Sequence, residues 1–84
     1  MAQESLAPTY TLRADWDPEA NVWVTVSDEV PGLATEAATL DALAEKLRIL
    51  IPELLEANQR VLGDGREISF EIVGHRRERL LLAS

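Results

Sequence analysis

The sequence predicts a small α+β domain of the order β-β-β-α-β, with one long helix packed on one face of a four-stranded mixed sheet. Three observations lead to this prediction. Residues 39–62 repeat leucine at alternating spacings of three and four, which is typical of an amphipathic helix. Residues 9–16, 22–27 and 66–73 instead alternate apolar and polar side chains, which is typical of half-buried strands. Short segments rich in Gly, Pro and Asp separate these stretches and predict turns.

The predicted helix has recognisable ends and one interruption. Thr39 can cap the first turn because its hydroxyl accepts a hydrogen bond from an orphan amide, and Gly63 can close the last turn in a left-handed conformation. Pro52 removes one main-chain hydrogen bond inside the helix, at a cost of about 3 kcal/mol. The segment is therefore either one kinked helix or two helices. We favour one kinked helix, because Ile51 would be a poor cap for a second helix.

Two turns organise the three strands before the helix. Pro18 and Asn21 suit the turn between the first two strands, which should form an antiparallel hairpin. Pro31 and Gly32 fit the central positions of a type II turn. Residues 33–37 should then form a short third strand that leads directly into the helix.

One sheet face should remain open to water, because a single helix covers only one side. Trp23 is the unusual member of this face, and it is either covered by Arg13 or a neighbouring loop, or an anchor for a partner. We expect the open face to carry Thr11, Arg13, Asp15, Trp23, Thr25, Ser69 and Glu71.

Composition restricts the class of protein. The 84 residues are enough for one domain, and the absence of cysteine excludes disulfides and thiolate metal sites and suits the cytoplasm. No apolar run is long enough to cross a membrane, and the first residues do not resemble a signal peptide. We therefore expect a cytoplasmic protein that binds no membrane.

The charge is unevenly distributed. The chain has a net charge of −7, and residues 1–65 alone hold twelve acidic and four basic residues, a net charge of −8. Such a body should repel nucleic acid and attract a basic protein. The alternative is that the acidity serves only solubility.

The sequence predicts a single domain at residues 9–74 with a tail at each end. Residues 1–8 show no period and should form a flexible N-terminal tail. Residues 75–84 combine arginines with three consecutive leucines. They are expected to extend the fourth strand and to pair with a second copy, with a frayed tail and a nucleic-acid contact as alternatives. The oligomer contacts expected in this arm are Arg77, Leu80, Leu81 and Leu82.

The sequence offers little for catalysis. His75 stands alone, without the partners of a metal site or a catalytic triad, so no cofactor, metal or enzymatic activity is expected. The alternative is a metal-dependent nuclease of ribonuclease-H-like fold, in which Asp15 and Glu71 face the same way on the open side of the sheet. A small regulatory domain of unknown ligand is a third possibility.

A family resemblance rests on the β-hairpin, on the stretch Val30-Pro31-Gly32-Leu33 and on the sequence TLDAL that opens the helix at 39–43. Over residues 9–58 the chain resembles the HicB-like antitoxin family, and especially small uncharacterised bacterial proteins allied to it. The resemblance implies a partial ribonuclease-H-like fold without nuclease activity. It also implies a function, neutralisation of a small basic ribonuclease toxin in a type II toxin-antitoxin pair.

The resemblance and the charge together predict the partners. We expect a non-catalytic protein-interaction module that binds a small basic toxin and also itself, as a homodimer or higher oligomer. Many members of the family append a DNA-binding domain, and we expect none here because too few residues follow Val73. The residues expected to contact the toxin are Trp23, Asp28, Glu29 and Glu36.

Overall fold

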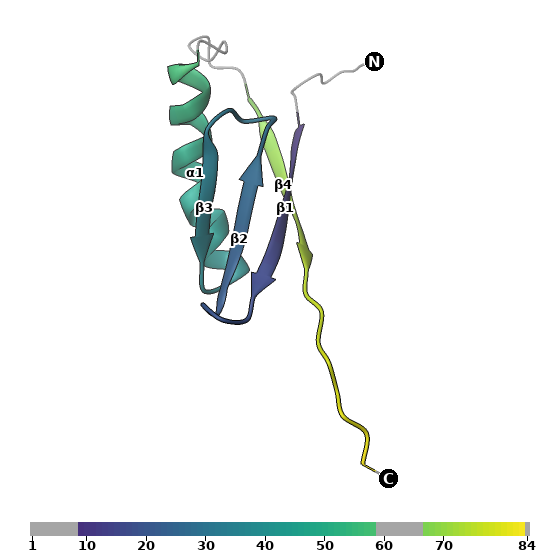
Figure 1. Cartoon of the computed structure of the whole chain (residues 1–84). Helices are drawn as coiled ribbons and strands as arrows, with labels where there is room; N and C mark the ends of the chain where they lie inside the picture. The colour runs from purple at the N-terminus through teal and green to yellow at the C-terminus, as the bar shows by residue number, and fades with distance from the viewer. Residues whose placement is uncertain (1–8, 59–66, 84) are drawn as a thin grey trace, which may run out of the picture.

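The computed structural model describes residues 9–58 and 67–83. Its elements are β1 (Thr9–Asp17), β2 (Val22–Ser27), β3 (Leu33–Ala37), α1 (Leu40–Ala57) and β4 (Ser69–His75). The strands form one sheet in the order β3-β2-β1-β4, in which β2 runs antiparallel to β1 and β3, and β4 runs parallel to β1. Helix α1 lies along one face of this sheet (Figure 1). The predicted fold class is therefore confirmed.

Helix α1 begins at the predicted cap. The hydroxyl oxygen of Thr39 accepts a hydrogen bond of 3.0 Å from the main-chain N–H of Ala42. Pro52 lies inside a single helix, which confirms one helix rather than two. No helix in the described part of the chain is both long enough and apolar enough to cross a bilayer.

The C-terminal end of α1 differs from the prediction. The helix ends at Ala57, earlier than the predicted Leu62, and Asn58 is its C-cap. The side-chain amide of Asn58 donates a hydrogen bond of 2.8 Å to the carbonyl oxygen of Leu54, and so satisfies a carbonyl group that the helix end leaves free. The predicted cap Gly63 lies outside the described residues, as does the predicted N-terminal tail at 1–8.

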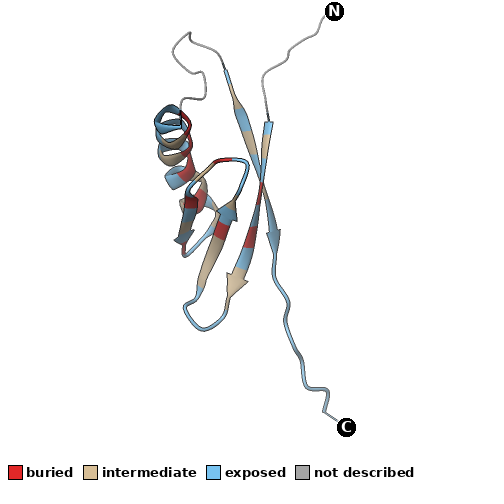
Figure 2. Ribbon diagram, turned by 45° about the horizontal axis from the view of Figure 1, so that its top comes forward, coloured by how far each residue is buried: buried red, intermediate tan, exposed pale blue. Residues whose placement is uncertain are grey.

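The core lies between α1 and the sheet. Figure 2 shows buried residues along α1 and along the strands beside it, and these residues form one hydrophobic cluster. Burial of each large aliphatic side chain contributes about 1.5–3 kcal/mol to stability, so this single stripe holds the domain together. The helix contributes Leu43, Leu47, Ile51 and Leu55, and the rest of the chain contributes Leu12, Ala14, Val30, Leu33 and Ala37.

The turn before β3 has the predicted geometry. The main-chain N–H of Leu33 donates a hydrogen bond of 3.0 Å to the carbonyl oxygen of Val30, and Gly32 has a φ of 86°, as a type II turn requires. Val30 and Leu33 are both buried, so the turn directs two apolar side chains into the core. A Cβ atom on Gly32 would lie 3.6 Å from a methyl carbon of Leu54, which places this turn against the last part of α1.

Strand β2 faces the opposite way from the prediction. The loop of residues 18–21 pairs Asp17 with Val22, so that Trp23 lies opposite Trp16 and Thr25 lies opposite Ala14. Cross-strand partners share a face, and Trp16 and Ala14 lie on the helix side. The prediction that Trp23 and Thr25 lie on the open face is therefore wrong. The β2 residues on the open face are Val22, Val24 and Val26.

Small residues make room for Trp23 on the helix side. Its six-membered ring lies against Gly74 of β4, where a Cβ atom would be only 3.3 Å from the ring and 3.4 Å from a methyl carbon of Leu40. Trp23 also makes an edge-to-face contact with Trp16, with ring centroids 5.4 Å apart. The indole of Trp23 therefore covers the end of the sheet nearest the start of α1.

Candidate partner-binding surface

The open face is the side of the sheet that points away from α1. Val26 and Val73 lie on the strands that flank β1 and are 66% and 51% exposed, so an apolar surface of β-branched side chains is accessible there. The register places on this face Thr11, Arg13, Asp15, Val22, Val24, Val26, Ala34, Glu36, Ser69, Glu71, Val73 and His75.

Polar side chains connect β1 and β4 across the open face. The hydroxyl of Thr11 donates a hydrogen bond of 2.9 Å to the carboxylate of Glu71. The hydroxyl groups of Thr9 and Ser69 are hydrogen-bonded at 2.8 Å. These bonds join residues that are paired in the parallel β1–β4 ladder, so they support the register of that pair.

Asp15 is the centre of a small charged cluster at the other end of the same ladder. One carboxylate oxygen of Asp15 accepts a hydrogen bond of 3.0 Å from Nε of Arg13, and the same oxygen lies 3.5 Å from Nδ1 of His75. All three side chains are more than half exposed, so the Arg13–Asp15 ion pair contributes only about 0–1 kcal/mol to stability. The cluster orients side chains but does not form a buried polar site.

Residues 76–83 form an arm that follows β4 and points away from the rest of the molecule (Figure 1). Arg76 stacks its guanidinium over the ring of Trp16, 4.1 Å from the centroid, and also pairs with Glu78. Arg77 and Arg79 line a shallow pocket with the Asp15 cluster. Beyond them, Leu80, Leu81 and Leu82 are 86%, 99% and 87% exposed.

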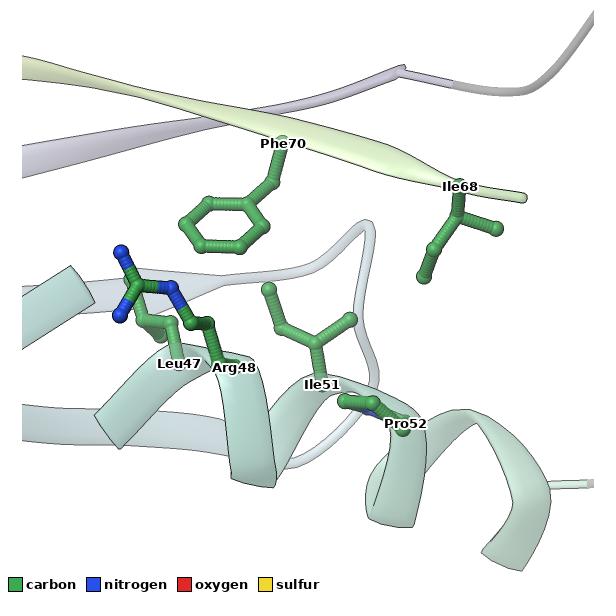
Figure 3. Close-up of a pocket in the computed structure, with 6 residues that line it drawn as sticks. All are labelled: Leu47, Arg48, Ile51, Pro52, Ile68 and Phe70. Atoms are coloured by element: carbon green, nitrogen blue, oxygen red, sulfur yellow. The ribbon is translucent and has the colours of Figure 1, made fainter. Parts of the chain in front are cut away.

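The side groove is a second hollow, between α1 and β4. Figure 3 shows Phe70 of β4 and Ile68, which directly precedes β4, pointing towards the helix, with Ile51 and Pro52 opposite them. The groove has a volume of about 170 Å³. An apolar cavity of about 150 Å³ can hold a benzene ring, so the side groove has room for an aliphatic side chain. Its lining residues are Leu47, Arg48, Ile51, Pro52, Ile68 and Phe70.

The four residues expected to contact a toxin do not form one patch. Trp23 lies on the helix side, and Glu36 lies on the open face, opposite Val24 in the β2–β3 ladder. Asp28 and Glu29 follow the far end of β2, about 16 Å along the strand from Trp23. Glu29 is also engaged within the chain, because its carboxylate accepts a hydrogen bond of 3.2 Å from the main-chain N–H of Thr11.

The two carboxylates of the nuclease alternative face the same way but lie far apart. Asp15 pairs with His75 in the β1–β4 register, and Glu71 is four residues away from His75 along β4. That separation is about 13 Å, too far for both to bind one ion directly. In the part of the chain that the structure describes, no three His, Cys, Asp or Glu side chains gather closely enough to hold a metal ion.

The outward valines are the part of this surface that sequence reasoning missed. The sequence prediction placed Trp23 and Thr25 on the open face, which would put Val22, Val24 and Val26 on the core side. The length of the preceding loop was the available signal. It pairs Asp17 with Val22, and this pairing places Trp23 beside Trp16.

Comparison with known proteins identifies relatives of unknown role. The crystal structure of hypothetical protein TTHA1013 from the extremely thermophilic bacterium Thermus thermophilus is similar, with 47% sequence identity and a TM-score of 0.64, and the match covers 88% of this chain and 99% of that chain. No curated protein matches the chain. A family model described as "Domain of unknown function (DUF1902)" matches residues 9–84, and the chain therefore belongs to the DUF1902 family.

Proposed function

We propose that this chain is a non-catalytic protein-interaction module, a HicB-like antitoxin that binds a small basic ribonuclease toxin through the open face of its sheet. The observation that carries the proposal is the combination of exposed apolar and acidic side chains on this face. Val26 and Val73 are exposed there, and Glu36 and Glu71 lie on the two outer strands beside them.

The chemistry of this face suits a basic partner. The exposed valines can lose contact with water when a partner covers them, which favours association at about 25 cal/mol per Å² of apolar surface. The carboxylates and the net charge of −7 would attract a positively charged protein and orient it during approach. Binding of this kind should weaken as the salt concentration rises.

The resemblance to HicB-like antitoxins supports the same partner. Its motif residues have structural roles here, because Pro31 and Gly32 form the turn against α1 and Thr39 caps that helix. The proposed pair acts in the cytoplasm, which is in keeping with a chain without cysteine.

A co-expression experiment tests the proposal. The small basic protein encoded next to this chain should arrest growth and cleave messenger RNA when expressed alone, and co-expression of this chain should restore growth. The purified pair should form a complex whose Kd rises with salt. A neighbouring protein that is harmless alone, or one whose toxicity this chain does not relieve, would contradict the antitoxin role.

Matched charge reversals locate the binding face. Glu36→Lys reverses a charge on the open face and should weaken toxin binding about tenfold or more, because it replaces an attractive contact by a repulsive one. Glu45→Lys makes the same change on an exposed position of α1, away from the open face, and should leave the Kd close to that of the unmodified chain. Equal losses in both variants would argue for a general charge effect.

A further inference from the structure

The arm continues the alternation of β4 although no strand among the described residues pairs with it. Even-numbered β4 residues such as Phe70 and Gly74 lie on the helix side, and Arg76 follows them, because it contacts Trp16 on that side. Continued alternation places Leu80 and Leu82 on the helix side as well. The last part of the arm therefore places Leu80 and Leu82 on the helix side and Leu81 on the side of the open face.

The outer edge of β4 is available for pairing. β4 is the last strand of the sheet in the part of the chain that the structure describes, so no described strand lies beyond its outer edge. At the opposite edge, Lys46 donates a hydrogen bond of 2.6 Å to the carbonyl oxygen of Glu36 and so occupies one main-chain group of β3. An exposed strand edge is a template for another chain.

We propose that two copies of this chain form a symmetric dimer in which β4 and the arm of one copy pair antiparallel with β4 and the arm of the other. In the proposed register, His75 lies opposite its own counterpart on the two-fold axis. Leu80 of each copy then lies beside the other copy's Phe70, and Leu82 lies beside its Ile68. These two leucines enter the side groove of the second copy.

The side groove fits this occupant. The wall opposite the helix is formed by Ile68, just before β4, and by Phe70 of β4, and Leu80 and Leu82 have the same spacing of two residues on the arm. A strand added to β4 would therefore place each leucine against one apolar residue of the wall (Figure 3). The helix wall supplies a further apolar contact through Pro52, which is exposed there.

Charge complementarity supports the same register. On the open face, the proposed pairing sets Arg79 of one copy opposite Glu71 of the other, and opposite charges directly across two strands stabilise their pairing. The arm holds three arginines and one glutamate, whereas residues 1–65 carry a net charge of −8. A shift of the register by two residues in one direction would place Leu81 opposite Glu71 and lose the ion pair. A shift in the other direction would place Arg77 opposite Glu71 but would move Leu80 away from Phe70 to Ile68.

The arm is directed towards a second copy rather than back to its own groove. The arm leaves the body from the C-terminal end of β4 (Figure 1), whereas Phe70 lies at the beginning of β4 and Ile68 directly precedes it. Return to the same chain would need a reversal immediately after β4. Antiparallel pairing of two copies needs no reversal, and the dimer does not depend on the proposed toxin partner.

Light scattering of the full chain tests the dimer, and the expected mass is that of two chains. Leu80→Asp combined with Leu82→Asp should lower the mass to that of one chain, because it places carboxylates in the apolar groove. Leu81→Asp is the matched control on the other face of the arm and should leave the dimer intact. A one-chain mass for the unmodified protein, or equal dissociation by Leu81→Asp, would overturn the proposal.

Cross-linking tests the register, because the chain contains no cysteine of its own. His75→Cys should form a disulfide-linked dimer on mild oxidation, since residues directly opposite in an antiparallel pair have Cα atoms about 4.5–5.5 Å apart, within the range that a disulfide spans. Arg77→Cys, which would face Val73 of the other copy, should cross-link far less. Equal cross-linking of the two variants would refute this register.

A charge swap gives an independent measurement of the same pairing. Arg79→Glu and Glu71→Arg should each raise the dimer dissociation constant, and the double variant should restore it towards the original value. Failure of the double variant to recover would contradict the pairing of Arg79 with Glu71. Because these variants are measured without any toxin, a failed toxin experiment leaves the dimer test unaffected.

Discussion

The hydroxyl of Thr25 donates a hydrogen bond of 2.8 Å to the main-chain carbonyl oxygen of Arg13. The β1–β2 pairing ends at Ala14 and Thr25, so the Thr25 side chain bonds to the first main-chain carbonyl of β1 beyond the paired residues. Two residues further back, the N–H of Thr11 bonds instead to the carboxylate of Glu29. Beyond the end of the β1–β2 pairing, side chains therefore provide hydrogen bonds to main-chain groups of β1. Main-chain polar groups that are removed from water need such partners.

Thr25→Val tests the hydrogen bond to Arg13. The substitution keeps the shape of the side chain but leaves the carbonyl oxygen of Arg13 without its donor, and Thr25 is only 1% exposed. We expect a loss of about 1–3 kcal/mol in the free energy of unfolding, measured with urea. Thr25→Ser keeps the hydroxyl and should lose less. A valine variant as stable as the unmodified chain would show that the bond contributes little.

The facing of β2 shows where sequence reasoning failed and why. The segment VWVTVS alternates in either orientation, because its valines form one apolar set and Trp23 and Thr25 form another. Hydrophobicity favoured the valines as the buried set. The loop between Asp17 and Val22 fixes the register of β2 against β1, and this register places Trp23 and Thr25 on the helix side. Once β1 has one face towards the helix, the pairing determines which side chains of β2 share that face.

The helix and the turn before β3 could be predicted because each depends on local chemistry. Thr39 caps its own helix, and Gly32 adopts the φ that its turn requires. The candidate surfaces depend on contacts between distant segments instead. The side groove joins Ile51 to Phe70, and Trp23 reaches Gly74, so neither could be read from spacing along the chain.

Gly32→Ala tests the turn below α1. A Cβ atom at a φ of 86° is strained, although the nearest atom of Leu54 leaves space for it at 3.6 Å. We expect the free energy of unfolding to fall by at least about 1 kcal/mol, from backbone strain rather than from collision. Gly32→Asn should lower the free energy of unfolding by less than Gly32→Ala does, because asparagine tolerates positive φ better than alanine. Equal losses for alanine and asparagine would indicate a steric cause.

Gly74→Val tests the contact with Trp23. The added side chain would meet the indole ring and Leu40, which already lie within 3.4 Å of the position of a Cβ atom. Overpacking of this kind typically costs about 1–3 kcal/mol, and the fluorescence of Trp23 should change with it. Trp23→Leu as a single substitution should lower the free energy of unfolding. In the Trp23→Leu background, Gly74→Val should cause a smaller further loss of stability than it does in the unmodified chain. Additive losses in the double variant would show that the two residues do not interact.

Ile51→Ala and Ile49→Ala form a matched pair on α1. Ile51 is 1% exposed in the core beside the side groove, whereas Ile49 is 63% exposed two positions earlier on the same helix. Both substitutions remove the same atoms and slightly favour the helix, so their difference measures burial alone. We expect Ile51→Ala to lower the free energy of unfolding by about 2–5 kcal/mol and Ile49→Ala to change it by less than about 0.5 kcal/mol, both measured by urea denaturation. A large loss for Ile49→Ala in the purified chain would mean that its side chain is covered in solution, which would require a second contact surface on the outer side of α1.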